Sequence, residues 1–201
     1  MPSVEVVSFT ASPALLADIK LADGVLDYLK NVEGCISIVK GYTIEEPTKV
    51  CMLITWDSYE SYESMTRRED YGSLRENMKL LLAAPPTIYH VDFDVDISEA
   101  VAASFTEIAV LTPKEGYAVQ EVTSVMKKMQ GITAHYPGVM FGMPIGQIRD
   151  VSGSVLILAG WVSLEAPEET AKTSPFAELV ADFLQISDLT NNHVSFSALV
   201  L

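Results

Sequence analysis

The chain of 201 residues carries the same pattern twice, and this repetition limits the folds that it can adopt. Five segments of the first half recur in the same order in the second half, at offsets from 102 residues (Glu5 to Glu107) to 105 residues (Trp56 to Trp161). The matched segments are 4–13 with 106–113, 33–47 with 137–150, 50–58 with 155–163, 71–78 with 176–183, and HVDF at 90–93 with HVSF at 193–196. We therefore expect two copies of one structural unit.

Each half predicts the same order of secondary structure: strand, helix, two strands, one or two helices, and a last strand. Apolar residues recur at helical spacing between Ser12 and Gly34, with Ser12 placed as an N-cap, Pro13 as the first helical residue and Gly34 just past the end. The counterpart helix is expected over 116–132. The other expected elements are helices within 59–82 and 164–186, buried central strands near 50–54 and 155–161, and last strands at 87–96 and 193–201.

This order, β-α-β-β-α-β, is that of a ferredoxin-like unit, in which helices cover one face of a four-stranded antiparallel sheet. A second copy can cover the other face of the sheet. The sequence thus predicts an α+β chain of two tandem ferredoxin-like repeats, packed sheet to sheet as an intramolecular α/β barrel. We place the repeats at 1–97 and 105–201, with residues 98–104 as the linker.

The stretch EGCISIVKGYTIEEPTKVCMLITWDS (33–58) and the closing HVDF and HVSF resemble the dimeric α/β-barrel superfamily, in particular its antibiotic-biosynthesis-monooxygenase-like branch, in tandem form as in fungi. The resemblance covers nearly the whole chain twice. It implies that one chain supplies both units of the barrel, so that the protein is a monomer built as a pseudo-dimer, or a homodimer. Members of the superfamily include cofactor-free monooxygenases, haem-degrading enzymes, polyketide cyclases, isomerases and proteins of no known activity, so the fold does not fix the function.

We expect from this resemblance an enzyme of secondary metabolism that acts on a small apolar molecule, aromatic or polyketide-like, without a cofactor. The reaction is either oxygenation, in which the substrate's carbanion reduces oxygen, or proton-transfer chemistry such as cyclisation. The alternatives are a non-catalytic binding or stress-response protein for a hydrophobic molecule, and an assembly module with an acidic surface. Haem is not expected, because the haem-degrading branch supplies a histidine from a helix that here contains none.

Charge and hydropathy exclude several partners. The chain has 27 acidic and 13 basic residues and a formal charge of −14, which disfavours nucleic acid and anionic membrane surfaces. No apolar run approaches the ~18 residues of a membrane span, and the first ten residues do not read as a signal peptide. Cys35 and Cys51 fall in strands joined by a hairpin turn in a register that separates them, so no disulfide is expected. These features suit the cytoplasm.

The two repeated histidines are the first candidates for catalysis. His90 and Asp92 share one face of their predicted strand, and His193 and Ser195 share one face of theirs. A histidine in the cleft between sheet and helices can act as base or polariser at neutral pH, with Asp92 or Ser195 beside it. A histidine that fixes the start of the strand by hydrogen bonds explains the repetition equally well.

Glu5 and Glu107 also repeat, each early in a first strand, and each is either a general base or the partner of a neighbouring group. If the last strand runs antiparallel beside the first, Glu5 lies near residues 94–95 and forms no dyad with His90. Trp56 and Trp161, the two tryptophans of the chain, are candidates for binding substrate or for core packing.

Four further residues are candidates for binding the substrate. His135 and Tyr136 occur in the second half alone, which fits a chain in which one half keeps a site, or a solvated loop. Tyr42 and Tyr71 can line a pocket and donate hydrogen bonds, or serve as ordinary strand and helix aromatics. The sequence contains no metal-binding spacing of His and Cys and no glycine-rich nucleotide motif, so neither a metal nor a nucleotide cofactor is expected.

Overall fold

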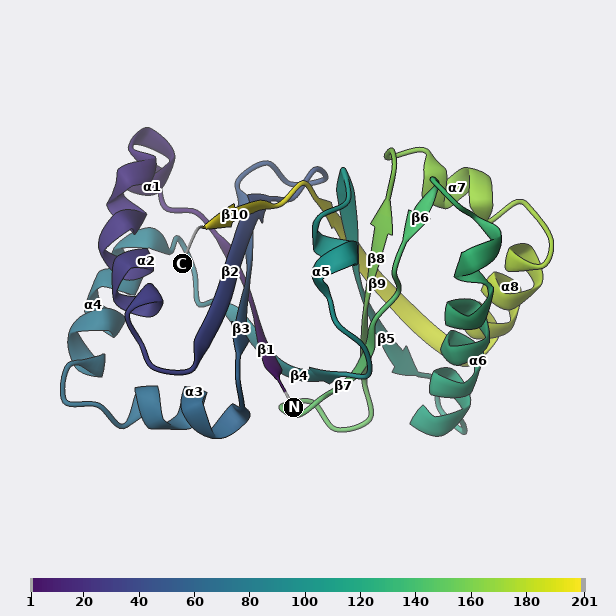
Figure 1. Cartoon of the computed structure of the whole chain (residues 1–201), viewed down its shortest axis with the longest axis horizontal. Helices are drawn as coiled ribbons and strands as arrows, with labels where there is room; N and C mark the ends of the chain where they lie inside the picture. The colour runs from purple at the N-terminus through teal and green to yellow at the C-terminus, as the bar shows by residue number, and fades with distance from the viewer. Residues whose placement is uncertain (1, 200–201) are drawn as a thin grey trace. The chain divides into compact units, whose positions relative to one another are not determined.

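Each half of the chain forms an antiparallel sheet, and the longer helices of each half pack on one face of that sheet (Figure 1). The computed structural model describes residues 2–199, which form two compact units, one of residues 2–90 and 197–199 and one of residues 91–196. The α+β class predicted from the sequence is confirmed. The repeat boundaries at 1–97 and 105–201 rest on the sequence pattern and stay a prediction, and residues 1, 200 and 201 lie outside the described part.

In the first unit the sheet order is β10-β2-β3-β1-β4. Its strands are β1 (Ser3–Thr10), β2 (Cys35–Tyr42), β3 (Lys49–Trp56), the first part of β4 (Thr87–Phe93) and β10 (Ser197–Leu199). Its helices are α1 (Pro13–Ala17), the 3-10 turn η1 (Ile19–Ala22), α2 (Asp23–Lys30), α3 (Tyr59–Thr66) and α4 (Tyr71–Leu81). Within the β2–β3 hairpin Cys51 pairs with Gly41, as expected, and both cysteines are free thiols.

In the second unit the sheet order is β4-β7-β8-β5-β9, with Val91–Phe93 of β4 paired to β7 and the short β6 paired to β8. Its strands are β5 (Phe105–Pro113), β6 (Met140–Phe141), β7 (Ile145–Ile148), β8 (Val155–Trp161) and β9 (Ser187–Val194). Its helices are α5 (Ser98–Val101), α6 (Val119–Ile132), the 3-10 turn η2 (Thr133–His135), α7 (Ala166–Thr170) and α8 (Phe176–Ile186). Residues 98–104, expected as a linker, thus contain a helix of this unit.

The first helical region of the chain begins as predicted but is interrupted. The Ser12 side chain accepts a hydrogen bond from the backbone N–H of Leu15 at 3.1 Å, and Pro13 is the first residue of α1. The expected continuous helix is wrong, because Asp18 adopts extended angles (φ −144°, ψ 101°) and its side chain accepts from the N–H of Lys20 instead. Aspartate competes for nearby backbone donors in this way, so helical spacing of apolar residues continues across a break in the helix.

The last predicted strand also differs from the structure. The segment expected as one strand over 193–201 is divided: β9 ends at Val194, and β10 pairs with β2 in the first unit. β9 begins at Ser187, directly after α8, so most of it precedes the predicted start. Leu189 is the one apolar residue at 188–192, so this segment lacks the apolar alternation by which strands are found in a sequence.

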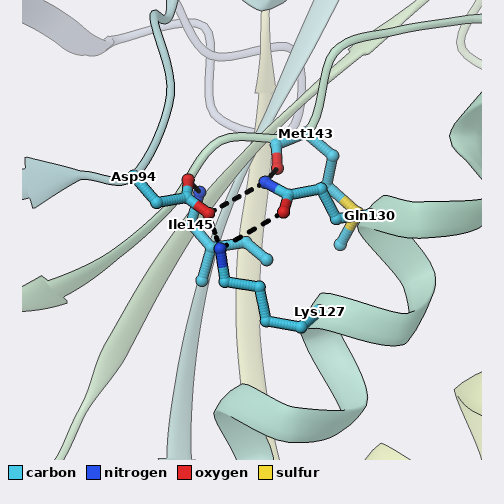
Figure 2. A network of polar contacts seen from close by, with 5 residues as sticks. All are labelled: Asp94, Lys127, Gln130, Met143 and Ile145. Carbon is cyan, nitrogen blue, oxygen red and sulfur yellow. Dashed lines mark hydrogen bonds and ion pairs between the residues drawn. The ribbon is translucent and has the colours of Figure 1, made fainter.

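A polar network around Asp94 ties the segment after β4 to α6 in the second unit (Figure 2). The Asp94 carboxylate accepts hydrogen bonds from the backbone N–H of Ile145 at 2.8 Å and from Gln130 Nε2 at 3.0 Å, and it pairs with Lys127. Gln130 Nε2 also donates to the carbonyl of Met143 at 2.9 Å. One carboxylate therefore holds a helix and a loop in place.

Asp94→Asn is expected to lower the stability of the second unit by about 1 kcal/mol at neutral pH, because the amide cannot accept every bond of the network. Burial alone would raise the pKa of the Asp94 carboxyl, but its hydrogen-bond donors outweigh burial and hold the pKa below its usual 3.8. A carboxyl with a lowered pKa stabilises the fold above its unfolded-state pKa, and this stabilisation is lost as the pH falls through the folded-state value. Urea unfolding followed by circular dichroism should therefore show that the free energies of unfolding of the wild-type protein and of Asp94→Asn approach each other as the pH falls below about 4. A difference in free energy that does not change with pH would contradict this role of Asp94.

Candidate functional site

The repeated glutamates and tryptophans meet in pairs. In the first unit Trp56 Nε1 donates to Oε2 of Glu5 at 3.2 Å, and in the second unit Trp161 Nε1 donates to Oε2 of Glu107 at 3.1 Å. Both indole rings are buried, with exposed fractions of 0% and 2%. The same contact between two residue types that recur at matched positions supports the repeat and points to one place in each unit.

Glu5 lies on the face of its sheet that the helices cover. Side chains alternate along a strand, and the neighbouring odd-numbered residues Val7 and Phe9 belong to the apolar core beneath the helices. The Glu5 residue is 7% exposed. A carboxylate in this layer is costly to bury unless it has polar partners, so its retention in an apolar layer suggests a role beyond packing.

A cavity of about 610 Å³ lies beside Glu5 in the first unit. Tyr71 and Arg75 add polar groups to its wall, and the rest of the wall is largely apolar. The apolar lining includes Val7, Leu29, Met52, Ile54, Met65, Leu74, Met78 and Ile88. A largely apolar cavity of this size with a few convergent polar groups is typical of small-molecule binding sites.

The negative charge of Glu5 acts on two neighbours. Burial raises the pKa of the Tyr71 phenol, the charge of Glu5 raises it further, and Arg75 opposes both. Burial, with a smaller contribution from Glu5, raises the pKa of the Cys35 thiol to about 11. At neutral pH Tyr71 is therefore a hydrogen-bond donor, and Cys35 is a protonated thiol that is a poor nucleophile.

The corresponding place in the second unit has a smaller cavity. Glu107 lines a cavity of about 230 Å³ together with Trp161. Its second oxygen, Oε1, accepts a hydrogen bond from Asn191 Nδ2 at 2.7 Å. The position that matches Asn191 in the first half, at the offset of the HVDF and HVSF segments, is Ile88, whose side chain cannot donate. The two units therefore hold equivalent carboxylates in different surroundings.

The two histidines lie in different environments. The His90 ring is 4% exposed and packs against two tyrosines of α3, with ring centroids 5.2 Å from Tyr59 and 4.1 Å from Tyr62. In the second unit His193 is the direct partner of Glu107 in the β5–β9 register. The sequence-based register concerned Glu5 and residues 94–95 of the first half and stays a prediction there, whereas the pairing of Glu107 with His193 is a finding in the second unit.

The remaining predicted residues are spread over both units. Asp92 forms an ion pair with Arg149. Tyr42 lines a separate cavity of about 230 Å³ in the first unit. His135 is exposed on η2, and the ring of Tyr136 meets Phe176 edge to face, with ring centroids 5.6 Å apart.

Of all the predicted candidates, the structure brings together Glu5, Trp56 and Tyr71 in the first unit, and Glu107, Trp161 and His193 in the second.

Sequence reasoning named Tyr71 but missed the other side chains of α4 that complete the first cavity. Tyr71, Leu74, Arg75 and Met78 all line it. Their spacing of three, four and seven residues places them on one face of a helix, and this signal was available in the sequence. Among the residues that the structure describes, no group of three or more His, Cys, Asp and Glu side chains could hold a metal ion. None of the described helices is both long and apolar enough to cross a membrane.

Comparison with known proteins adds the fold of the whole chain. No protein-family model and no curated protein matches the sequence. Among solved structures, the chain is similar to a candidate monooxygenase from Lactobacillus acidophilus NCFM, with a TM-score of 0.66 and 13% identity over 100% of this chain and 99% of the other. It is also similar to a candidate monooxygenase from Fusobacterium nucleatum, with a TM-score of 0.72 and 9% identity over 98% and 93%. An anthrone oxidase-like protein matches with a TM-score of 0.65 and 15% identity over 98% and 91%.

These full-length likenesses confirm the fold that the sequence resemblance implied. The chain shares its α+β fold with these three structures over nearly its whole length, as the resemblance to the dimeric α/β-barrel superfamily implied. At such low identity the likeness extends to the fold alone. The sheet-to-sheet packing of the two repeats stays a prediction, and any activity has to be argued from the residues of the cavities.

Proposed function

We propose that this protein is an enzyme that removes a proton from a small apolar, aromatic or polyketide-like molecule bound in the cavity of the first unit. The observation that carries the proposal is the buried Glu5 carboxylate in the wall of a largely apolar cavity of about 610 Å³. Glu5 acts as the general base, and a base placed in a water-poor cavity can take a proton from a weakly acidic carbon or hydroxyl group. Trp56 fixes the direction of the carboxylate, and Tyr71 donates a hydrogen bond to the oxygen on which negative charge develops.

The site suits both reactions expected from the sequence, because oxygenation and cyclisation begin with the same loss of a proton. We favour oxygenation of an anthrone-like substrate, a choice supported by the anthrone oxidase-like structure among the similar ones. Glu5 would take a proton from the central methylene group, and the resulting carbanion would reduce molecular oxygen. The hydroperoxide so formed loses water and leaves a carbonyl group, so that one methylene and one oxygen molecule give one carbonyl and one water.

The candidate base differs from the one favoured by the sequence. His90 or His193 was expected as the base, but the His90 ring packs against two tyrosines of α3, whereas Glu5 lines the cavity. In the second unit the Glu107 carboxylate accepts hydrogen bonds from both Trp161 and Asn191, and the cavity beside it is about 230 Å³. Because the cavity beside Glu5 is the larger of the two, we assign the reaction to the first unit and a structural role to Glu107.

An oxygen-electrode assay with anthrone as the probe tests this function. The purified protein is expected to raise the rate of oxygen uptake well above the uncatalysed oxidation in buffer, with one anthraquinone formed for each oxygen molecule consumed. Heat-denatured protein at the same concentration is the control. The rate should rise with pH until the base is fully ionised, because only the carboxylate accepts a proton.

The second candidate function is binding without catalysis, and the same assay separates it. Anthrone that binds to the protein, as seen by isothermal titration calorimetry, but is oxidised no faster than in buffer would favour a binding or stress-response protein. Proton exchange at the methylene group, followed by NMR in D2O, then tests the first step by itself. If a bound anthrone neither reacts with oxygen nor exchanges faster than in buffer, the proposed proton abstraction is wrong for this class.

A further inference from the structure

The first unit contains a second apolar cavity that adjoins the one beside Glu5. This distal chamber of about 230 Å³ is lined by residues of β1, β2, β3, β10, α1, η1, α2 and α4, among them Phe9, Ala22, Tyr42 and Val50. The two cavities share two wall residues, Met52 of β3 and Met78 of α4. Because one methionine comes from the sheet and the other from a helix, the pair forms a partition across the layer between them.

The two cavities follow one another along the strands. The cavity beside Glu5 is lined by Glu5 and Val7 of β1, and the distal chamber by Phe9 of the same strand. On β3 the order is the same, because Val7 pairs with Met52 and Phe9 pairs with Val50. Four residues of strand, at about 3.3 Å each, separate Glu5 from Phe9, so the two cavities together span about 13 Å or more.

Methionine makes this partition adjustable. Its side chain is unbranched, turns about three single bonds and adapts to irregular spaces, unlike a branched or aromatic side chain. The Met52 residue is 5% exposed, and Met78 is partly buried against the same core. A change of rotamer at Met78 alone therefore alters the opening between the chambers without moving the backbone.

We propose that the two cavities form one bipartite site for an elongated apolar molecule, with Met52 and Met78 as the residues that determine its length. An aromatic head with an ionisable hydroxyl or methylene group binds beside Glu5 and Tyr71. An apolar chain extends from this head between the two methionines into the distal chamber, where Tyr42 lies. The placement of the head rests on the proposed function, whereas the joined chambers rest on the shared walls alone.

The second unit offers an internal comparison. At the offset of 105 residues the position of Met78 is occupied by Phe183 and that of Met52 by Ile157. Both of these residues line the cavity of about 230 Å³ in the second unit. The first unit thus has the two adaptable side chains where the second has an aromatic and a β-branched one, which narrow the choice of rotamers.

A series of 4-n-alkylphenols, from ethyl to nonyl, tests the bipartite site by isothermal titration calorimetry on the full-length protein. With the wild-type protein the affinity is expected to rise by up to about fourfold for each added methylene, equivalent to about 0.8 kcal/mol, through the longest chains. In Met78→Phe the affinity should stop rising with chain length once the alkyl chain fills the cavity beside Glu5. The affinity of the nonyl compound relative to the butyl compound should fall by about 15-fold, which corresponds to two methylenes left in water.

A second variant closes the distal chamber from its other side. Ala22→Leu adds a side chain to η1 at the wall of that chamber and should shorten the preferred chain in the same way as Met78→Phe, without touching the partition. Phe183→Leu is the matched control in the second unit and should leave the dependence on chain length unchanged. Circular dichroism and thermal unfolding establish that each protein is folded.

The proposed function and the bipartite site affect different parts of this experiment. Glu5→Gln should weaken every phenol of the series by the same factor, because the head loses a charged acceptor, and leave the dependence on chain length intact. If Glu5→Gln changes no affinity, the placement of the head is wrong and the joined chambers are judged on the chain-length dependence alone. If Met78→Phe and Ala22→Leu both keep the wild-type dependence, the chambers are not joined and the bipartite site is overturned.

Discussion

Glu5→Gln is expected to lower the rate of anthrone oxidation by about 10²–10⁴-fold, the usual contribution of a general base. The substitution keeps the size of the side chain, and the amide oxygen still accepts the hydrogen bond that Trp56 Nε1 donates to Oε2. The amide, however, cannot take up a proton. The fold should therefore be retained while the reaction is lost. The loss of activity is measured as the initial rate of anthrone oxidation at several pH values. Thermal unfolding shows whether the variant is folded.

Glu107→Gln is the matched control, because the same residue type holds the same place in the second unit. Its carboxylate accepts hydrogen bonds from Trp161 and Asn191. The glutamine amide has a single oxygen, so it can accept only one of these two hydrogen bonds. Its NH2 group faces the other donor, and about 1–2 kcal/mol of stability should be lost. The oxidation rate should stay close to that of the wild-type protein.

The pair of variants decides where the reaction takes place. If Glu107→Gln abolished the reaction and Glu5→Gln did not, the active cavity would be in the second unit. If both variants kept the full rate, the base would be another group, and His90 and His193 would again be the first candidates. A loss in both would mean that the units depend on one another for activity.

The sequence predicted the elements of each unit because the signals for them are local. The apolar spacing of the helices, the cap at Ser12 and the nearly continuous apolar runs of β3 and β8 all lie within a few residues of what they specify. The repetition also identified the glutamates and the tryptophans as matched pairs. It could not show that each glutamate accepts a hydrogen bond from its tryptophan, because those residues are 51 and 54 positions apart.

The start of the last strand in the second unit was the main error of the sequence-based prediction. β9 starts at Ser187, where the chain leaves α8 with no intervening loop and the Ser187 hydroxyl donates to the carbonyl of Phe183 at 2.7 Å. In residues 188–192 that follow, Leu189 is the one apolar residue, so the sequence shows no alternation of apolar and polar residues that would mark a strand. Its register is set instead by pairing along β5, which places His193 opposite Glu107.

The cavities depend on packing that no local pattern reports. Met52 of β3 and Met78 of α4 are more than twenty positions apart in the sequence, and the space around them is set by how their neighbours fill the layer. The pattern of apolar residues predicts an apolar core between the sheet and the helices, but it does not predict the cavities within that core. The difference between about 610 Å³ in one unit and about 230 Å³ in the other was therefore not predictable from two similar segments.

Gly160→Ala is expected to destabilise the second unit by about 3 kcal/mol, because an added methyl group has no space there. A Cβ atom on Gly160 would lie 2.4 Å from the carbonyl oxygen of Phe141, 2.9 Å from the Cα of Ala100 and 2.9 Å from the Cβ of Ala103. Two of these three atoms belong to the backbone. Backbone cannot yield as the end of a flexible side chain can, so the strain has to be relieved by displacing α5 or β6.

The reason for this glycine is the segment that the sequence suggested as a linker. α5 packs against β8, Ala100 is 0% exposed, and its carbonyl accepts a hydrogen bond from the Thr106 hydroxyl at 2.8 Å. At the offset of 105 residues, the first half has Thr55 in place of Gly160. A strand interior favours threonine over glycine, so the glycine in the second half indicates a close approach of another backbone.

Thermal unfolding of Gly160→Ala should show a midpoint lower by roughly 6–12 °C, from about 2–4 °C for each kcal/mol in a chain of this length. Thr55→Ala in the first unit is the control and should cost no more than about 1 kcal/mol, because it creates no overlap. Ser98 and Val101, the ends of α5, should exchange their amide hydrogens faster in the Gly160→Ala protein if the helix is pushed away from β8. Equal stability of the two variants would mean that α5 does not pack on β8 in solution, and the segment would then be the linker that the sequence suggested.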